Sequence, residues 1–429
     1  MTESPDSLET PPARTGASPW TCPFCLLLCD SATVEASADG SLLLRGPACE
    51  CATRALARFR ATPSQAQPLV DGAPATLADA IAAAARFLKA SRQPLFGGLG
   101  TDVAGARALY RLASLTGAIS DASGGGPLAQ GLRVLQDRGQ YTTTLAEVRT
   151  RADLIVCLPG LPLAQAPTFF DRCGVGEAQV LAPLRHIAML GGSTEEAAAL
   201  EALAERPGVS VEALPLHEGD IFTTAAILAA LVAGRSVANA PQSLQALAER
   251  LQQARYAVIV GEPARLPDHG ALAMEAINRI VGLLNLRTRA GVMWLGGGNG
   301  ASTANQVYTW LSGLPLRSRA GPLGLEHEPL CFGAERLLAD GAVDSLLWIS
   351  SFDPDSVPPQ TDLPLIVIGH PELPVKGSVF IPVSTPGIGS AGHLFRADGV
   401  VMLPLFPVYA DTLPTLSQVL AQIAGALQS

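Results

Sequence analysis

Short apolar runs alternate along the chain with longer alanine-rich segments in which apolar side chains recur every third or fourth position. The short runs are typical of strands buried on both faces, and they predict strands at residues 93–98, 154–158, 256–261, 346–350 and 365–368, with weaker signals at 179–182 and 209–214. The longer segments predict helices at residues 52–61, 76–90, 101–115, 194–205, 221–233, 239–254, 271–284 and 412–427.

The predicted strand at residues 93–98 ends in glycines, and the helix at 101–115 follows it directly. A strand, a glycine turn and a helix form the repeating unit of a parallel sheet, and a second such pattern starts at residue 256. A chain of 429 residues is long for a single domain. We therefore expect an α/β protein with mostly parallel sheets. It should have two domains, at residues 62–240 and 241–429, and each domain can be built from segments that are not continuous in sequence.

Charge and hydropathy narrow the class of protein. The net charge of −9 and the isoelectric point near 5.2 exclude a basic nucleic-acid surface. No run reaches the ~18 apolar residues that a membrane span needs. Residues 1–19 are rich in Ser, Thr, Pro and Glu and contain no apolar core, which predicts a disordered tail and neither a signal peptide nor a membrane anchor. We expect a cytoplasmic protein with reduced thiols and no membrane or nucleic-acid partner.

Cysteines gather in the segment at residues 20–61, called the hook below. Cys22, Cys25 and Cys29 have the spacing C-x2-C-x3-C, and Cys49 or Cys51 supplies a fourth sulfur. Four thiolates at such spacings suit an iron–sulfur cluster or zinc. Two alternatives stay open: the cysteines are small buried apolar residues, or two of them form a disulfide, which is disfavoured without a secretion signal.

Catalytic motifs are missing from the sequence. Four glycine-rich stretches, which contain Gly97, Gly124, Gly296 and Gly387, lack the endings of nucleotide-binding loops, and ordinary turns explain them equally well. The six histidines form no paired zinc motif, and there is no nucleophile elbow. His217 and His393 lie near predicted loops, where histidines are usually structural. The residues therefore indicate no self-sufficient active site.

Four stretches resemble the B subunit of formylmethanofuran dehydrogenase, a relative of molybdopterin oxidoreductases. They are CPFCLLLCD at 22–30, RADLIV at 151–156, NQVYTWLSGLP at 305–315, and IPVSTPGI at 381–388 with RADGV at 396–400. The resemblance implies two Rossmann-like domains with mostly parallel sheets plus the small cysteine-rich hook. It also favours Cys49 over Cys51 as the fourth ligand, giving the set Cys22, Cys25, Cys29 and Cys49 for structural zinc or a [4Fe-4S] cluster.

The departures from this family concern its redox site. Family members carry a metal-binding cysteine and an assisting histidine before Gly-Pro, where this chain has Gly124 and Gly125. Their arginine before a Gly-x-x-Asn stretch is replaced by Leu295 or Gly296. Glycine has no donor atom in its side chain, so we expect no molybdopterin or tungstopterin and no catalytic residue in this chain.

This pattern is similar to the B subunits of bacterial formyltransferase/hydrolase complexes. The resemblance implies a non-catalytic structural subunit, with a formyltransferase, a metallo-hydrolase and a third subunit as partners. Such a complex moves a formyl group from tetrahydromethanopterin to methylofuran, which the complex holds, and hydrolyses it to formate. The alternative is an active molybdopterin or tungstopterin formylmethanofuran dehydrogenase subunit with an iron–sulfur cluster.

For Arg54, Arg58 and Arg60, a solvated helix face is favoured over contact with an acidic partner or an anionic cofactor.

Overall fold

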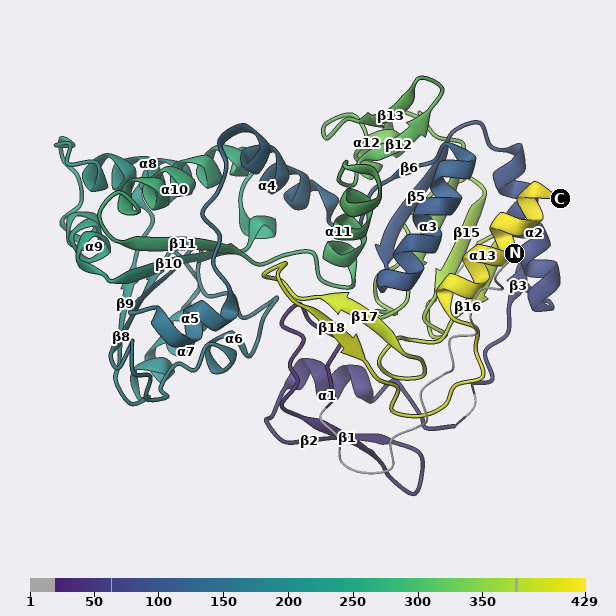
Figure 1. Cartoon of the computed structure of the whole chain (residues 1–429), viewed down its shortest axis with the longest axis horizontal. Coiled ribbons are helices and arrows are strands. Elements are labelled where there is room, and N and C mark those ends of the chain that lie inside the picture. Colours follow the sequence, from purple (N-terminus) through teal and green to yellow (C-terminus); the bar gives the residue numbers. More distant parts are fainter. Residues whose placement is uncertain (1–19, 63, 375–376) are drawn as a thin grey trace, which may run out of the picture.

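The computed structural model describes residues 20–429 except 63 and 375–376, so the expected tail at 1–19 lies outside the described residues. Two α/β lobes lie side by side, each around its own sheet (Figure 1). The hook and the hairpin of β17 (Gly392–Phe395) and β18 (Met402–Leu405) lie at the junction of the lobes. The α/β class with mostly parallel sheets and a cysteine-rich N-terminal segment is confirmed.

The first lobe contains a five-stranded parallel sheet in the order β11-β10-β7-β8-β9. Its strands are β7 (Leu154–Cys157), β8 (Arg185–Leu190), β9 (Val209–Leu214), β10 (Tyr256–Gly261) and β11 (Arg289–Trp294). Alternate side chains of β7 and β10 enter separate cores on the two faces. One face packs against α8 (Ile221–Val232), α9 (Gln242–Gln253) and α10 (Gly270–Leu284), and the other against α5 (Leu145–Arg151), α6 (Phe169–Arg172) and α7 (Thr194–Ala204). Both faces are covered, which explains the continuous apolar strands.

The second lobe contains a nine-stranded sheet in the order β13-β12-β6-β5-β14-β15-β16-β3-β4. Its parallel centre consists of β5 (Pro94–Gly100), β6 (Ile119–Ser120), β14 (Ser345–Ser350), β15 (Leu365–Gly369) and β16 (Val379–Pro382). The antiparallel edges are β12 (Ser318–Gly321) with β13 (Gly324–His327), and β3 (Leu69–Val70) with β4 (Ala73–Pro74). One face packs against α2 (Leu77–Ala90), α3 (Val103–Thr116), α11 (Ala301–Ser312) and α13 (Leu416–Gln428), and the other against α12 (Ala334–Ala339).

The hook is a small unit that docks on the C-terminal part of the chain. It consists of a hairpin, β1 (Thr33–Ala36) and β2 (Leu42–Arg45), followed by α1 (Glu50–Leu56). Trp20, Leu56 and Phe59 share one hydrophobic cluster with Ile388, and Trp20 Nε1 donates a 2.8 Å hydrogen bond to the carbonyl of Gly387. The hook therefore uses residues from the far end of the sequence to complete its core.

The strand pairing corrects several expectations. It runs across the expected boundary at residues 240 and 241, because β10 pairs with β7 and β14 pairs with β5. The two lobes are therefore discontinuous in sequence. Residues 179–182 form no strand, and Val180 is 96 % exposed, while the actual strand β8 begins at Arg185. The hook helix begins and ends earlier than residues 52–61. Within the described ranges, no helix is long and apolar enough to cross a membrane.

Candidate functional site

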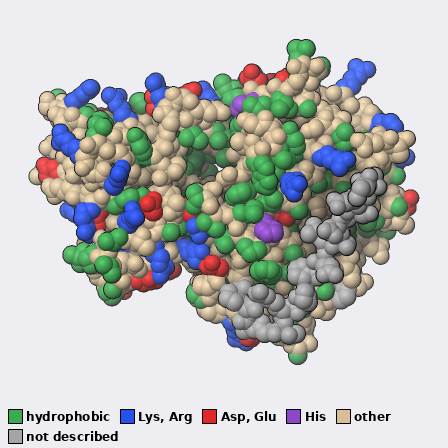
Figure 2. All heavy atoms as spheres, in the orientation of Figure 1, with side chains coloured by type: hydrophobic (Ala, Val, Ile, Leu, Met, Phe, Trp, Pro, Cys, Tyr) green, Lys and Arg blue, Asp and Glu red, His purple; other side chains and the backbone are tan. Residues whose placement is uncertain are grey.

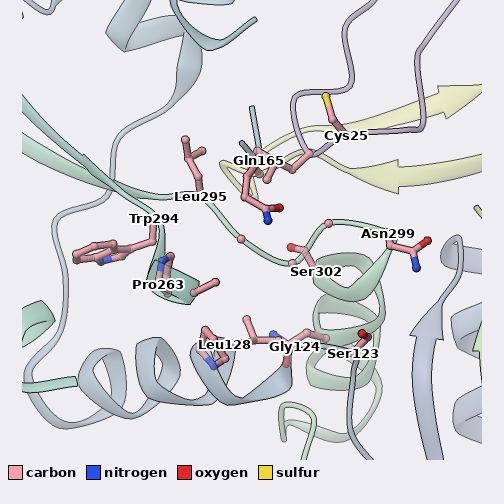
Figure 3. Close-up of a pocket in the computed structure, with 18 of the residues that line it drawn as sticks. Cys25, Ser123, Gly124, Leu128, Gln165, Pro263, Trp294, Leu295, Asn299 and Ser302 are labelled. Atoms are coloured by element: carbon pink, nitrogen blue, oxygen red, sulfur yellow. The ribbon is translucent and has the colours of Figure 1, made fainter. Parts of the chain in front are cut away.

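A cavity of about 880 Å³ lies between the two lobes. The segments that line it follow the carboxyl ends of parallel strands from both sheets: Pro263 follows β10, Gly296 follows β11, Phe352 follows β14 and His370 follows β15. Crevices at the carboxyl ends of parallel strands are where open α/β sheets bind ligands. The remaining walls come from α4 (Gly125–Arg138), α11 and the hook (Figure 3).

Gly124 and Gly125, the positions at which the resemblance led us to expect glycines in place of a cysteine and a histidine, lie at the start of α4. Gly124 lines the cavity and has a φ of +66°, a left-handed conformation that side chains disfavour. A Cβ on Gly125 would overlap the carboxylate of Asp121. That carboxylate is held by Arg317 Nε at 3.2 Å and by the N–H of Ala334 at 2.9 Å. The local backbone is therefore built around two residues without side chains.

The carboxylate of Asp121 is itself buried. Burial raises the pKa of Asp121, and the positive charge of Arg317 opposes this shift. A side chain at position 125 would displace a buried ion pair, and such pairs are costly to separate.

The glycine-rich loop at residues 296–300 connects β11 to α11 and passes through the cavity wall (Figure 3). Gly300 has a φ of +77°, and a Cβ there would overlap the backbone of Thr101, so the loop needs glycine at this point. The side chain of Asn299 donates a 3.2 Å hydrogen bond to Ser350 Oγ. Leu295 is buried and Gly296 lines the cavity, so neither places a charge at the position of the family's arginine.

The hook cysteines lie near one another, with Cys25 and Cys51 on the cavity wall. Burial raises the pKa of Cys22, and the charges of Cys29, Cys49 and Cys51 raise it further. The hydrogen bond between Cys25 and Cys29 raises the pKa of Cys25 and lowers that of Cys29 to about 6. Across residues 20–62, 64–374 and 377–429, no three Cys, His, Asp or Glu side chains meet in a metal-binding group. The site at Cys22, Cys25, Cys29 and Cys49 stays a prediction.

Charged side chains around the cavity are mostly paired. Arg58 contacts Asp355 at 2.8 Å and Glu372 at 3.7 Å, so it is not the freely solvated side chain that the sequence favoured. The carboxylate of Asp398 is held at 2.6 Å by Arg396. Basic and acidic side chains are interspersed over the face in Figure 2, and that face has no continuous basic area.

His370, which no sequence motif singled out, is a buried histidine on the cavity wall. Its Nδ1 accepts a 3.0 Å hydrogen bond from the N–H of Glu372. Its ring packs edge-on against the ring of Phe59, with 4.9 Å between the two ring centroids. Burial lowers the pKa of His370 to about 4, and Arg58 contributes to this shift while Asp355 opposes it. The sequence feature that could have identified His370 is its position directly after a predicted buried strand. His217 and His393 do not line the cavity.

No family model matches the chain, but curated relatives and solved structures do. The B subunit of the formyltransferase/hydrolase complex Fhc of Methylorubrum extorquens is 29 % identical over 333 residues, which cover 76 % of this chain and 87 % of the relative. The crystal structure of the FhcABCD complex from the same organism, with methylofuran, contains a chain that matches with a TM-score of 0.70 and 26 % identity, covering 84 % of this chain and 98 % of that one. The resemblance to these B subunits is confirmed.

Two further proteins match the chain at lower identity. The B subunit of a tungsten-containing formylmethanofuran dehydrogenase of Methanocaldococcus jannaschii is 26 % identical over 410 residues, covering 88 % of this chain and 91 % of the relative. Acetylene hydratase of Pelobacter acetylenicus has a TM-score of 0.58 at 12 % identity, over 96 % of this chain and 69 % of that one, which is a likeness of fold alone.

Proposed function

We propose that the chain is a non-catalytic structural subunit of a formyltransferase/hydrolase complex that converts formyl-tetrahydromethanopterin to formate via methylofuran in one-carbon oxidation. The observation that carries this proposal is the match to a chain of the FhcABCD crystal structure, which covers 98 % of that chain at a TM-score of 0.70. The expected partners are a formyltransferase, a metallo-hydrolase and a third subunit, and the expected compartment is the cytoplasm. Methylofuran is held by the complex.

The cavity wall supports a non-redox role. Gly124 and Gly125 offer no ligand to a metal, and the crowding against Asp121 resists the introduction of one at position 125. Leu295 and Gly296 offer no positive charge to stabilise an anionic transition state. Within the cavity, the residue types that formate chemistry needs in the redox family are therefore missing at two separate places.

A complex purified through a tag on this chain tests the proposal. We expect three partner subunits to co-purify, formate to form from formyl-tetrahydromethanopterin when methylofuran is present, and no formate-dependent reduction of viologen dyes. Stoichiometric molybdenum or tungsten, together with dye reduction by formate, would instead establish the dehydrogenase alternative.

We further propose that Cys22, Cys25, Cys29 and Cys49 hold structural zinc or a [4Fe-4S] cluster. The support is chemical: four thiols lie near one another in a small unit, and thiolates are the preferred ligands of both groups. Such a group, when bound, supplies cross-links within the hook. The thiols of the described chain would have to converge further to hold it.

Elemental analysis tests this second proposal. We expect zinc or iron in the anaerobically purified chain, and a loss of that metal in a Cys22→Ser, Cys25→Ser variant. Cys331→Ser is the matched control, because Cys331 is an exposed cysteine outside the hook. Equal metal contents in all three proteins would contradict a hook metal.

A further inference from the structure

The helices that cover one face of the second lobe's sheet carry a one-sided distribution of charge. They are α2, α13, α3 and α11, which contact one another in that order, and their outer side is called the helix face below. α13 and α11 contain no charged residue, and α3 contains no acidic residue. The negative groups of these helices are the C-terminal carboxylate and Asp79, whose side chain accepts a 2.6 Å hydrogen bond from Thr76 Oγ1 at the start of α2.

The exposed charged side chains that remain on the helix face are all positive. They are Arg86 and Lys89 on α2, and Arg107 and Arg111 on α3. None of the four forms an ion pair with a described residue. In contrast, Arg138, which is also exposed, contacts Glu275 at 3.1 Å. The helix face therefore lacks the carboxylates that neutralise exposed arginines elsewhere in the chain.

The four cations form two pairs of like charge, separated by the uncharged α13. Arg107 and Arg111 are four positions apart on α3, and Arg86 and Lys89 are three positions apart on α2. Side chains at these spacings are neighbours on a helix, where like charges repel and lower its stability. Carboxylates from outside the chain would remove this repulsion.

Exposed apolar side chains accompany the cations (Figure 2 shows Lys and Arg over α3 and hydrophobic side chains over α11). Tyr110 of α3 and Tyr308 of α11 pack edge-on with 5.2 Å between their ring centroids, so the two helices lie against each other at this level. Trp310, two residues beyond Tyr308, is 56 % exposed, and Leu115 in the last turn of α3 is 45 % exposed. Tryptophan and arginine are the residue types most enriched at the centres of protein interfaces.

The size of the helix face matches one side of a protein–protein interface. Its helices have 12 to 14 residues each. Helices of that length are about 20 Å long and pack about 9 Å apart, so the face measures roughly 20 Å by 30 Å. One partner of a specific interface contributes about 800 Å² of accessible surface, which a corrugated face of these dimensions supplies.

The distribution of charge distinguishes a protein partner from a nucleic acid. Two separate pairs of cations give no continuous basic footprint, and the net charge of −9 repels a polyanion at a distance. A protein surface carries separate carboxylates that match separate cations. It also carries apolar side chains, which match the uncharged α13 and the exposed Trp310.

We propose that the helix face docks an acidic surface of one of the partner subunits. Carboxylates of that subunit pair with Lys89, Arg107 and Arg111, and its apolar side chains pack on α13 and Trp310. The inference rests on the structural role proposed above, and it adds the surface through which that role is performed.

Charge reversal tests the docking in the complex purified through a tag on this chain. The variant is Arg107→Glu with Arg111→Glu, in which both side chains are exposed and glutamate is a good helix former, so folding is preserved. The matched control is Arg235→Glu with Arg287→Glu. Both of these arginines are exposed in the first lobe without a described ion pair, and the net charge changes equally.

Mass spectrometry measures the amount of each subunit per tagged chain. We expect the Arg107→Glu, Arg111→Glu variant to retain about tenfold less of one partner subunit, while the control stays within about twofold of the parent. Arg107→Lys with Arg111→Lys keeps both charges and should also stay within about twofold. This third protein separates the loss of charge from the loss of the arginine side chains.

A second measurement uses the unaltered complex. The sequence contains two lysines, and one of them, Lys89, lies on the helix face. A water-soluble carbodiimide joins a lysine amine to a carboxylate in direct contact, without a spacer. We expect a cross-linked peptide that contains Lys89 and an Asp or Glu of a partner subunit. In Lys89→Arg the subunits should still co-purify, and this peptide should be absent.

Several outcomes would overturn the proposal. The first is equal retention of all subunits by the charge-reversal variant and its control, and the second is a complex in which Lys89 joins no partner subunit. Self-association of the chain alone that the charge-reversal variant abolishes would assign the face to a second copy instead. Oligonucleotide binding that the same variant abolishes would assign the face to a nucleic acid.

Failure of the structural role gives a different result. A tagged parent chain that captures no partner subunit would contradict that role, and this docking surface with it. A parent that captures its partners, with a charge-reversal variant that captures them equally well, contradicts the docking surface alone.

Discussion

At residue 125, the first turn of α4 leaves no room for a side chain, because the Asp121 carboxylate occupies the space of the Cβ. The resemblance implies a histidine at this position in the redox family, and in this chain the ion pair between Asp121 and Arg317 holds the carboxylate that fills the space. A side chain at this position would therefore have to displace the Asp121 carboxylate.

Gly125→Ala should destabilise the protein by about 2 kcal/mol, because overpacking against a buried group forces the backbone or Asp121 to move. Gly126→Ala is the control. The nearest atom to its new Cβ is 3.9 Å away, and alanine is a better helix former, so the variant should be more stable by about 0.5–1 kcal/mol. Urea denaturation measures the free energy of unfolding of both variants. A Gly125→Ala variant as stable as the parent would contradict the predicted overlap with the Asp121 carboxylate.

His370 makes stability depend on pH. Its pKa of about 4 in the folded protein lies below the ordinary 6.5, so the unfolded chain binds the proton more tightly. The neutral ring therefore stabilises the folded state at neutral pH, and this stability is lost as the pH falls from about 6.5 to about 4. The loss should reach about 3 kcal/mol.

Urea denaturation across this pH range measures the effect of His370 against a His370→Asn variant, which does not titrate. We expect the free-energy difference between parent and variant to shrink as the pH falls. A difference that is constant with pH would show that the imidazole does not carry the effect.

At the scale of elements, the strands with continuous apolar sequence were predicted because their two faces are both covered by helices. β7 and β10 are buried along nearly their whole length. β8 was missed because it begins with Arg185 and His186, which interrupt the apolar run. Arg185 is nevertheless buried, since its guanidinium donates to the carbonyl of Cys173 at 2.9 Å, a partner that only the folded chain supplies.

Glu196 joins three elements of the first lobe. Its carboxylate caps α7 by accepting the N–H of Ser193 at 2.8 Å, accepts the N–H of Leu161 at 2.9 Å and binds Arg265 at 2.7 Å. Glu196→Gln should lower the free energy of unfolding by about 2 kcal/mol, because it removes a charge-assisted pair. Glu195→Gln is the adjacent control and should change stability little, because Glu195 is fully exposed. Thermal denaturation compares the two, and equal shifts would argue against the joining role.

At the scale of the whole molecule, the hook and the C-terminal part form one unit although they are far apart in sequence. Two features make this connection: the hydrogen bond from Trp20 to the carbonyl of Gly387, and the hydrophobic cluster that contains both Phe59 and Ile388. The hook in turn closes one side of the interlobe cavity. Docking of the hook therefore sets the shape of the candidate binding site.

Trp20→Phe removes the donor to Gly387 and should destabilise hook docking by about 1–2 kcal/mol, because it leaves a buried carbonyl unpaired. Limited proteolysis followed by intact mass measurement should show faster cleavage between α1 and β3. Trp310→Phe is the control, because Trp310 is exposed on α11 and its loss should leave the cleavage rate unchanged. Equal rates for the parent and Trp20→Phe would mean that other contacts hold the hook.

The sequence by itself determined the α/β class, most helices and central strands, and the grouping of five cysteines in the hook, because these follow from local periodicity and residue spacing. Tertiary structure decided the discontinuous lobes, in which β10 joins β7 and β14 joins β5. It also decided the cavity between the lobes, whose lining includes both His370 and residues 296–299. The physical reason is that strand order and the burial of a polar atom depend on contacts between residues distant in sequence, which no local pattern records.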